Sequence, residues 1–156
     1  MIIFDDSLWP LLKLRFVGAH TSEQFEQYLL RLEAYVRQPG PCMVLLDLNA
    51  ASVPLEQCRQ QAEWMHANQA LLREKVLGLA FVSSSTRSRL SLNVILHLKP
   101  VPVAHTLVAD TRAAAEWAAD RFSDAGLLLP SVRIRQDFGL RPSGSFPSLS
   151  WAPAPR

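Results

Sequence analysis

A hydroxyl- and arginine-rich segment, S-S-S-T-R-S-R at 83–89, offers the clearest opportunity for binding chemistry in this sequence. It follows an apolar run and precedes a helical pattern, and the free backbone N–H groups at a helix start attract anions. The side chains that would add hydroxyl donors or positive charge are Ser83, Ser84, Ser85, Thr86, Arg87 and Arg89. The segment lacks the glycines of a phosphate-binding loop. It therefore predicts either a phosphate or nucleotide site or an ordinary N-cap of the next helix.

A single carboxylate, Asp47, closes a second apolar run, C-M-V-L-L-D-L at 42–48. A run without alternation is typical of a central strand that is covered on both faces. In open α/β sheets, ligands bind beyond the carboxyl ends of such strands. Asp47 is therefore a candidate binding residue, and the alternative is that it only caps a loop or a helix end.

The residue types that enzymes use most often are present, but not in catalytic or metal-binding patterns. His66, His97 and His105 have no acid or nucleophile close in sequence, and the four histidines lack metal-ligand spacing. Cys42 and Cys58 form no C-x-x-C motif and suit buried thiols. No serine lies in a G-x-S-x-G elbow. We therefore expect no enzymatic activity, no metal and no cofactor.

The elements that would position these residues alternate along the chain. Apolar runs and period-two patterns predict strands at 2–4, 11–17, 42–48, 77–82 and 103–109. Helical periodicity predicts helices at 21–38, 54–75, 87–98 and 110–126, the first with a capping-box spacing from Thr21 to Gln24. Strands that alternate with helices pair in parallel through right-handed crossovers. The prediction is one α/β domain with a mixed, mostly parallel sheet of about five strands, an antiparallel edge and four helices.

The character of the chain changes after Pro130. Residues 130–156 contain five of the eleven prolines and several serines, and residues 131–156 carry four arginines against one aspartate. Such a segment rarely compensates for the entropy lost on ordering. We therefore predict a domain at 1–129 and a basic tail at 130–156. The tail is either disordered or a peptide that docks on a partner through aromatic residues such as Phe146 and Trp151.

Three stretches of the predicted domain resemble the STAS domain, the fold of anti-sigma-factor antagonists and of the cytoplasmic ends of sulfate transporters. They are V-L-L-D-L-N-A at 44–50, A-F-V-S-S-S-T-R at 80–87 and V-A-D-T-R-A-A-A-E-W-A at 108–118. The likeness is closer to the STAS-like branch related to the antagonists or to the lipid-binding Sec14 fold. It implies a STAS-like topology over residues 1–128.

The resemblance also implies a regulatory role, with one departure from the family. In regulatory STAS domains the loop after this strand carries a hydroxyl that a partner kinase phosphorylates. The corresponding residue here is Asn49, which has no hydroxyl, and Ser52 follows three residues later as a possible substitute. What the resemblance still implies is a protein-docking face formed by Asp47, Asn49, Ser52 and the first turns of the next helix.

Two functions remain open from the sequence. The first is a non-enzymatic regulatory or adaptor module that docks a protein partner through the loop after the third strand. The second is a small-ligand domain for a nucleotide, phosphate or lipid, which would use the 83–89 turn or an apolar cleft between the helices at 54–75 and 87–98. Trp9, beside Pro10 in a hairpin loop, is a further candidate contact residue.

The composition limits the classes of partner that we expect for this protein. The net charge of +2 gives no strong attraction to nucleic acid, and no apolar run is long enough for a membrane span. The N-terminus does not resemble a signal peptide, so we expect a cytoplasmic protein. The hydrophobic share of 49% and an edge strand near the N-terminus also favour a homodimer.

Overall fold

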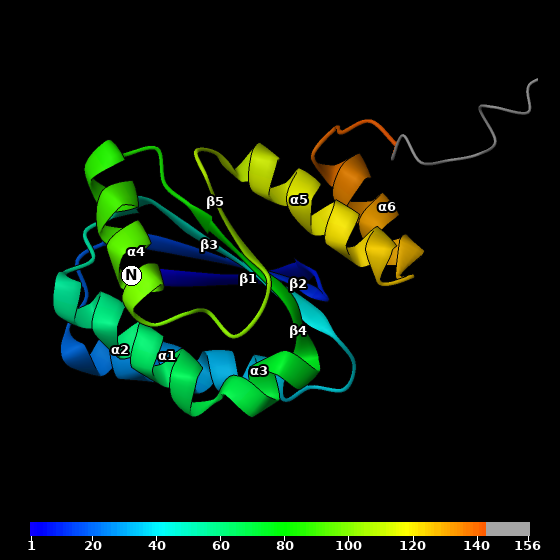
Figure 1. Ribbon diagram of the computed structural model, residues 1–156. Helices are drawn as coiled ribbons and strands as arrows, with labels where there is room; N and C mark the ends of the chain where they lie inside the picture. The colour runs from blue at the N-terminus through cyan, green and yellow to red at the C-terminus, as the bar shows by residue number, and fades with distance from the viewer. Residues whose placement is uncertain (143–156) are drawn as a thin grey trace, which may run out of the picture.

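The computed structural model describes residues 1–142 and contains a five-stranded sheet in the order β1-β2-β3-β4-β5. The strands are β1 (Ile2–Leu8), β2 (Leu11–Gly18), β3 (Cys42–Ala51), β4 (Val76–Val82) and β5 (His105–Val108). β1 pairs antiparallel with β2, and every other neighbouring pair is parallel. The predicted mixed, mostly parallel sheet with an antiparallel edge is therefore confirmed (Figure 1).

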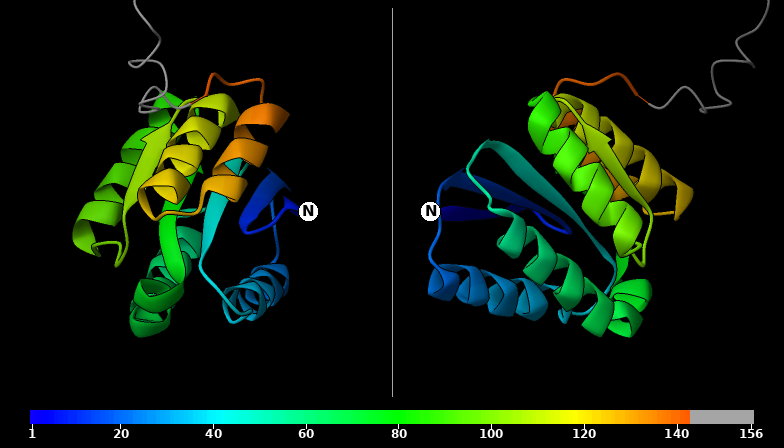
Figure 2. Two further views of the ribbon diagram at one scale, coloured as in Figure 1. Left: turned by 90° about the vertical axis from the view of Figure 1, so that its right-hand side faces the viewer. Right: turned by 60° about the vertical axis from the view of Figure 1, so that its left-hand side comes forward.

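Helices cover the two faces of the sheet unequally. One face carries α1 (Ser22–Val36), α2 (Leu55–Ala67), α3 (Gln69–Lys75) and α4 (Thr86–Leu98). The other carries α5 (Thr111–Asp124) and α6 (Leu128–Asp137), which lie side by side over the strands (Figure 2). None of the helices within residues 1–142 is long and apolar enough to cross a membrane.

The core follows from the side-chain pattern of the strands. In β2 the even residues Leu12, Leu14 and Phe16 are buried toward α1–α4, as the period of two predicts. In β3, Val44 and its even neighbours face the same layer, whereas Met43 and Leu45 face α5 and α6. This two-sided burial explains why the run at 42–48 shows no alternation.

The first helix begins as the sequence predicts. The Thr21 hydroxyl accepts from the Gln24 backbone N–H at 3.1 Å, and the Gln24 side chain accepts from the Thr21 N–H at 2.9 Å. This reciprocal capping box satisfies two N–H groups that a helix start otherwise leaves without partners. α1 then buries Phe25, Tyr28 and three aliphatic residues against the sheet.

The helix predicted at 54–75 is two helices. α2 ends at Ala67, and Asn68, with φ −105° and ψ 20°, separates it from α3. The Asn68 side-chain amide donates to the Trp64 carbonyl at 2.9 Å, which satisfies an acceptor at the end of α2. Asparagine favours such local bonds over continuation of a helix. With α6, this break raises the number of helices in the described chain from the predicted four to six.

The domain boundary predicted at residue 129 is wrong. Residues 128–137 form α6, whose Ile134 is fully buried against α5 and the sheet. Pro130 lies in the first turn of this helix, where its missing N–H costs nothing. The Arg112 guanidinium on α5 donates to the carbonyls of Phe138 and Gly139 at 2.7 and 3.1 Å. The remaining part of the predicted tail, with Phe146 and Trp151, lies outside the described residues.

Candidate functional site

The carboxyl edge of the sheet brings together the two segments that the sequence singled out. β3 pairs with β2 at Arg15–Asp47 and again at Val17–Ala50, so β3 holds one extra residue between these pairs. Such a bulge bends a strand and redirects its side chains. The bulge lies where Asn49 leaves the regular ladder.

Asn49 connects three elements through its side-chain amide. Its Oδ1 accepts from the backbone N–H of Ser84 at 2.7 Å, and its Nδ2 donates to the carbonyl of Ala109 at 3.4 Å. Ser84 follows β4 and Ala109 follows β5, so one side chain joins the ends of three neighbouring strands. Asn49 is exposed, but its polar atoms already have partners. Its contacts suit a residue that positions the edge.

The two other residues of the predicted docking face lie on either side of this junction. The Asp47 carboxylate accepts from the Asn49 N–H at 3.0 Å and lines a cavity of about 360 Å³. Lys13, Arg15 and Phe138 line the same cavity on the α5–α6 face of the sheet. Ser52 is exposed, and its backbone N–H donates to the Gly18 carbonyl at 3.0 Å.

The 83–89 segment forms a turn that is hydrogen-bonded both to neighbouring loops and within itself. Ser83 is buried, and its N–H donates to the Val108 carbonyl at 2.9 Å. Ser85 is the N-cap of α4, and its hydroxyl accepts from the Ser88 N–H at 3.3 Å. The segment therefore contains an N-cap of α4, as one of the two predictions expected. Exposed Thr86 and Arg87 begin α4, and half-buried Arg89 follows in its first turn.

Trp9 lies away from this edge. It precedes β2, and the Pro10 carbonyl next to it accepts from the N–H of Met43 near the start of β3. This is the opposite end of the parallel strands from Asn49. The Trp9 ring packs on Tyr35, with the two ring centroids 5.6 Å apart. The structure therefore does not bring Trp9 together with Asp47, Asn49 and Ser52.

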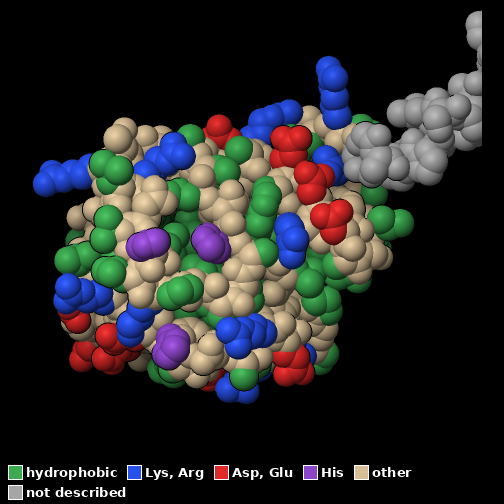
Figure 3. Space-filling view, viewed as in Figure 1, with side chains coloured by type: hydrophobic (Ala, Val, Ile, Leu, Met, Phe, Trp, Pro, Cys, Tyr) green, Lys and Arg blue, Asp and Glu red, His purple; other side chains and the backbone are tan. Residues whose placement is uncertain are grey.

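Sequence reasoning missed an apolar stripe on the outer face of α4. Leu90, Val94 and Leu98 are 61%, 59% and 74% exposed, and Leu55 at the start of α2 is 54% exposed. A groove of about 410 Å³ runs between α2 and α4 beside Leu55, Val94 and Leu98. In Figure 3 hydrophobic side chains gather over α4, with lysines and arginines around them. The i, i+4, i+8 spacing of the stripe is the signal that would have found it.

A small cavity lies beneath the same two helices. It measures about 40 Å³ and is lined mostly by apolar side chains of the sheet, α2 and α4. Gln57, 6% exposed, donates from Nε2 to the His20 carbonyl at 2.7 Å, but its Oε1 has no hydrogen-bond partner within residues 1–142. Half-buried Cys58 also lines the cavity, and burial raises the pKa of its thiol. A raised pKa disfavours the nucleophilic thiolate.

Comparison with known proteins supports the fold. No protein-family model and no curated protein sequence matches the chain. A solved structure of an uncharacterized protein of the DUF3478 family from Shewanella loihica PV-4, described as having a SpoIIAA-like fold, matches with a TM-score of 0.55. The two chains are 18% identical, and the match covers 76% of this chain and 92% of the other. The fold is therefore SpoIIAA-like, which is the STAS-like architecture that the sequence resemblance implied.

Proposed function

We propose that this protein is a non-enzymatic docking module that holds an apolar helix of a protein partner in the groove between α2 and α4. The observation that carries the proposal is the stripe of Leu55, Leu90, Val94 and Leu98, whose side chains are all more than half exposed. Exposed apolar side chains that lie together mark interaction surfaces, whereas single ones do not. Ser52 precedes α2, whose first residue, Leu55, lines the groove.

The charges around the groove favour a particular partner. Arg59 and Lys99 line it with one acid, Glu63, which pairs with Lys99 at 4.0 Å. Arg87 and Arg89 do not line the groove, but they add positive charge at the other end of α4, and this helix contains no acidic residue. An amphipathic helix with apolar residues at i, i+3, i+4 and i+7 and with acidic flanks would match the groove in shape and charge.

The first experiment is affinity capture from an extract of the source cells with quantitative mass spectrometry. We expect Leu98→Glu to lower recovery of the specific partner at least about tenfold, equivalent to about 1.4 kcal/mol, because a carboxylate would replace the apolar contact. The matched control is Leu129→Glu, since Leu129 is 71% exposed but belongs to α6.

Titration of the purified partner against both variants then measures the loss directly. The proposal fails if the proteins recovered with Leu98→Glu and with the wild type are the same in identity and amount. Circular dichroism of both variants checks that the fold is retained.

An apolar small molecule is the second candidate. It is favoured by the small, mostly apolar cavity beneath α2 and α4, which is also lined by Gln57, whose Oε1 has no hydrogen-bond partner within residues 1–142. A ligand longer than this cavity would require α4 to move outward. Decanoic and palmitic acid should then raise the melting temperature, because a ligand that binds only the native state stabilises it. Ala62→Leu should abolish that rise by filling the cavity, and no response to either acid would exclude this candidate.

A further inference from the structure

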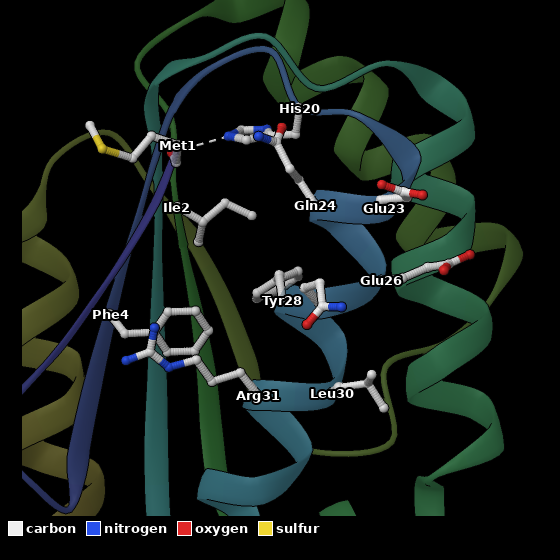
Figure 4. A pocket seen from close by; sticks show the side chains of 11 residues that line it. Met1, Ile2, Phe4, His20, Glu23, Gln24, Glu26, Tyr28, Leu30 and Arg31 are labelled. Atoms are coloured by element: carbon white, nitrogen blue, oxygen red, sulfur yellow. Dashed lines mark hydrogen bonds between the residues drawn. The ribbon is translucent and has the colours of Figure 1, made fainter.

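A second surface lies at the opposite edge of the sheet, between β1 and α1. Here a groove of about 930 Å³ is open to solvent (Figure 4). Ile2 and Phe4 form one wall, and the α1 side chains Gln24, Gln27, Tyr28 and Arg31 form the other. Buried His20 closes one end, where its Nε2 lies 3.1 Å from the Met1 carbonyl oxygen. The Arg31 guanidinium lies over the Phe4 ring, 4.2 Å from its centroid.

The groove is bordered by β1, which is the edge strand of the sheet. Met1 and Val17 exchange both backbone hydrogen bonds, at 2.8 and 2.9 Å, so they form a hydrogen-bonded antiparallel pair. Such pairs alternate along an antiparallel ladder, so Ile3 bonds toward β2 while the N–H and C=O groups of Ile2 and Phe4 point outward. Exposed edges of this kind are templates for another strand.

The edge is open only over its first half. Asp5 and Asp6 follow Phe4, and the regular pairing with β2 is interrupted between Asp5 and Leu8. Charged residues and irregularities at an edge discourage further pairing. The Asp6 carboxylate already has a hydrogen-bond partner, because it accepts from the Tyr35 hydroxyl at 3.0 Å. A strand that pairs with the free edge of β1 would therefore be centred on Ile3.

The side chains of α1 that border the groove are arranged to match an inverted copy of themselves. Glu23 lies in the first turn, Gln27 one turn further and Arg31 one turn beyond that, all on the groove side. When two such helices lie antiparallel with Gln27 at the centre, Glu23 of each faces the partner's Arg31. The two Gln27 amides meet across the axis, and each amide can donate and accept.

We propose that the occupant of the groove is a second copy of this chain, related by a two-fold axis through Ile3 and Gln27. β1 of each protomer extends the sheet of the other in antiparallel fashion, and the outward groups of Ile2 bond those of the partner's Phe4. The two α1 helices pack antiparallel on the same face of the continuous sheet. An isologous arrangement of this kind closes after two copies, so it does not propagate into fibres.

Light scattering of the full chain under native conditions tests the proposal. The wild type is expected at twice the chain mass of 17.4 kDa. Glu23→Arg and Arg31→Glu should each shift the protein toward the monomer, by at least about tenfold in dissociation constant, because each places like charges opposite one another. The double variant should restore the dimer, since it re-creates both ion pairs in reversed sense.

Two further variants test whether a loss of the dimer comes from the β1–α1 interface or from any change of surface charge. Gln27→Glu should also weaken the dimer, because it places two carboxylates across the axis. Glu116→Arg, the same reversal of an exposed acid on α5, should leave the mass unchanged. A monomeric wild type, or a dimer that none of the α1 substitutions weakens, would overturn the proposal. A monomer that instead binds an extended peptide along β1 would overturn it in favour of that other occupant.

Discussion

At the scale of single residues, Asn49 replaces the hydroxyl expected from the STAS resemblance with a group that has a separate donor and acceptor. Its Oδ1 binds the Ser84 N–H and its Nδ2 binds the Ala109 carbonyl. A hydroxyl has only one oxygen for both roles, whereas a primary amide has an acceptor oxygen and a separate donor nitrogen. The amide can therefore reach two neighbouring loops at once. We infer that Asn49 contributes to the rigidity of the carboxyl edge.

Replacing Asn49 should loosen the ends of β4 and β5. Asn49→Ala removes both bonds and is expected to lower the free energy of unfolding by about 1–2 kcal/mol. Amide hydrogen exchange at Ser84 should become faster. Asn49→Asp keeps an acceptor for Ser84 but loses the donor to Ala109, so its effect on Ser84 should be smaller. Equal exchange rates at Ser84 in the wild type and Asn49→Ala would contradict the assigned role.

Asp5 should give the protein an acid-sensitive contribution to stability. Hydrogen bonds from the Ser7 side chain and backbone N–H, and then Lys13 at 3.1 Å, lower the pKa of Asp5 to about 2 from 3.8. A carboxyl whose pKa is lower in the folded state stabilises that state above its unfolded pKa. This contribution is present above pH 4 and is lost as the pH falls from about 4 to about 2. Because the side chain is 43% exposed, solvent screening keeps it modest.

Urea denaturation between pH 5 and pH 2 measures this contribution. The slope of the unfolding free energy against pH in that range should be smaller for Asp5→Asn than for the wild type. Asp124→Asn, which removes an exposed carboxylate at the end of α5, serves as the control. Identical slopes for the wild type and Asp5→Asn would show that the Ser7 and Lys13 contacts do not persist in solution.

At the scale of elements, the sheet was predictable because its signals are local. Two-sided apolar runs mark the buried strands β3 and β4, and the alternation from Leu12 to Phe16 marks the half-covered β2. The start of α1 was predictable for the same reason, since the capping box lies within four residues. The capping bonds and the strand pattern involve neighbours in sequence, so no tertiary information was needed.

Two features of the helices were not predicted: the break between α2 and α3, and the presence of α6. α2 and α3 share an apolar stripe, and only the local bond of Asn68 separates them. α6 follows Pro130 in a segment whose composition resembles a tail, and its burial comes from contacts with α5 and the sheet. Leu127, Ser131, Ile134 and Phe138 recur at helical spacing, which is the signal that composition concealed.

The integration of α6 into the fold can be measured at one residue. Ile134→Ala should lower the free energy of unfolding by about 2–5 kcal/mol, because it leaves a cavity where a fully buried side chain packs. Leu129→Ala, on the same helix but 71% exposed, should change it by less than about 0.5 kcal/mol. Chemical denaturation compares the free energies of unfolding of the two variants directly. If both substitutions change this free energy by less than about 0.5 kcal/mol, α6 does not pack into the core.

The positions of the candidate site residues along the strands could be predicted, but the contacts between them could not. The sequence placed Asp47 and the 83–89 segment at the carboxyl ends of strands, which is where they lie. It did not show that Asn49 bonds Ser84, because the partners are 35 residues apart and their contact depends on the register of β3 and β4. The stripe on α4 was missed because the opposite, buried face of the helix accounted for its apolar residues.

At the scale of the whole molecule, the two proposed surfaces belong to different parts of one sheet. The β1–α1 groove lies at the β1 edge, whereas α4 follows β4 and leads into β5 at the other edge. The α5–α6 layer covers the opposite face of the sheet (Figures 1 and 2). A dimer formed through β1 would therefore keep both α2–α4 grooves open at the outer ends of its continuous sheet.

This separation predicts that self-association and partner binding can be removed independently. Arg31→Glu should yield a monomer that still binds the partner at each groove with unchanged intrinsic affinity. Leu98→Glu should remain a dimer that has lost the partner. If the partner displays two helices, the wild type should bind it more tightly than the Arg31→Glu monomer, because linked sites raise the effective concentration. Light scattering and titration of the same samples provide both readouts, and a single substitution that removes both activities would contradict the placement of the two surfaces on opposite edges.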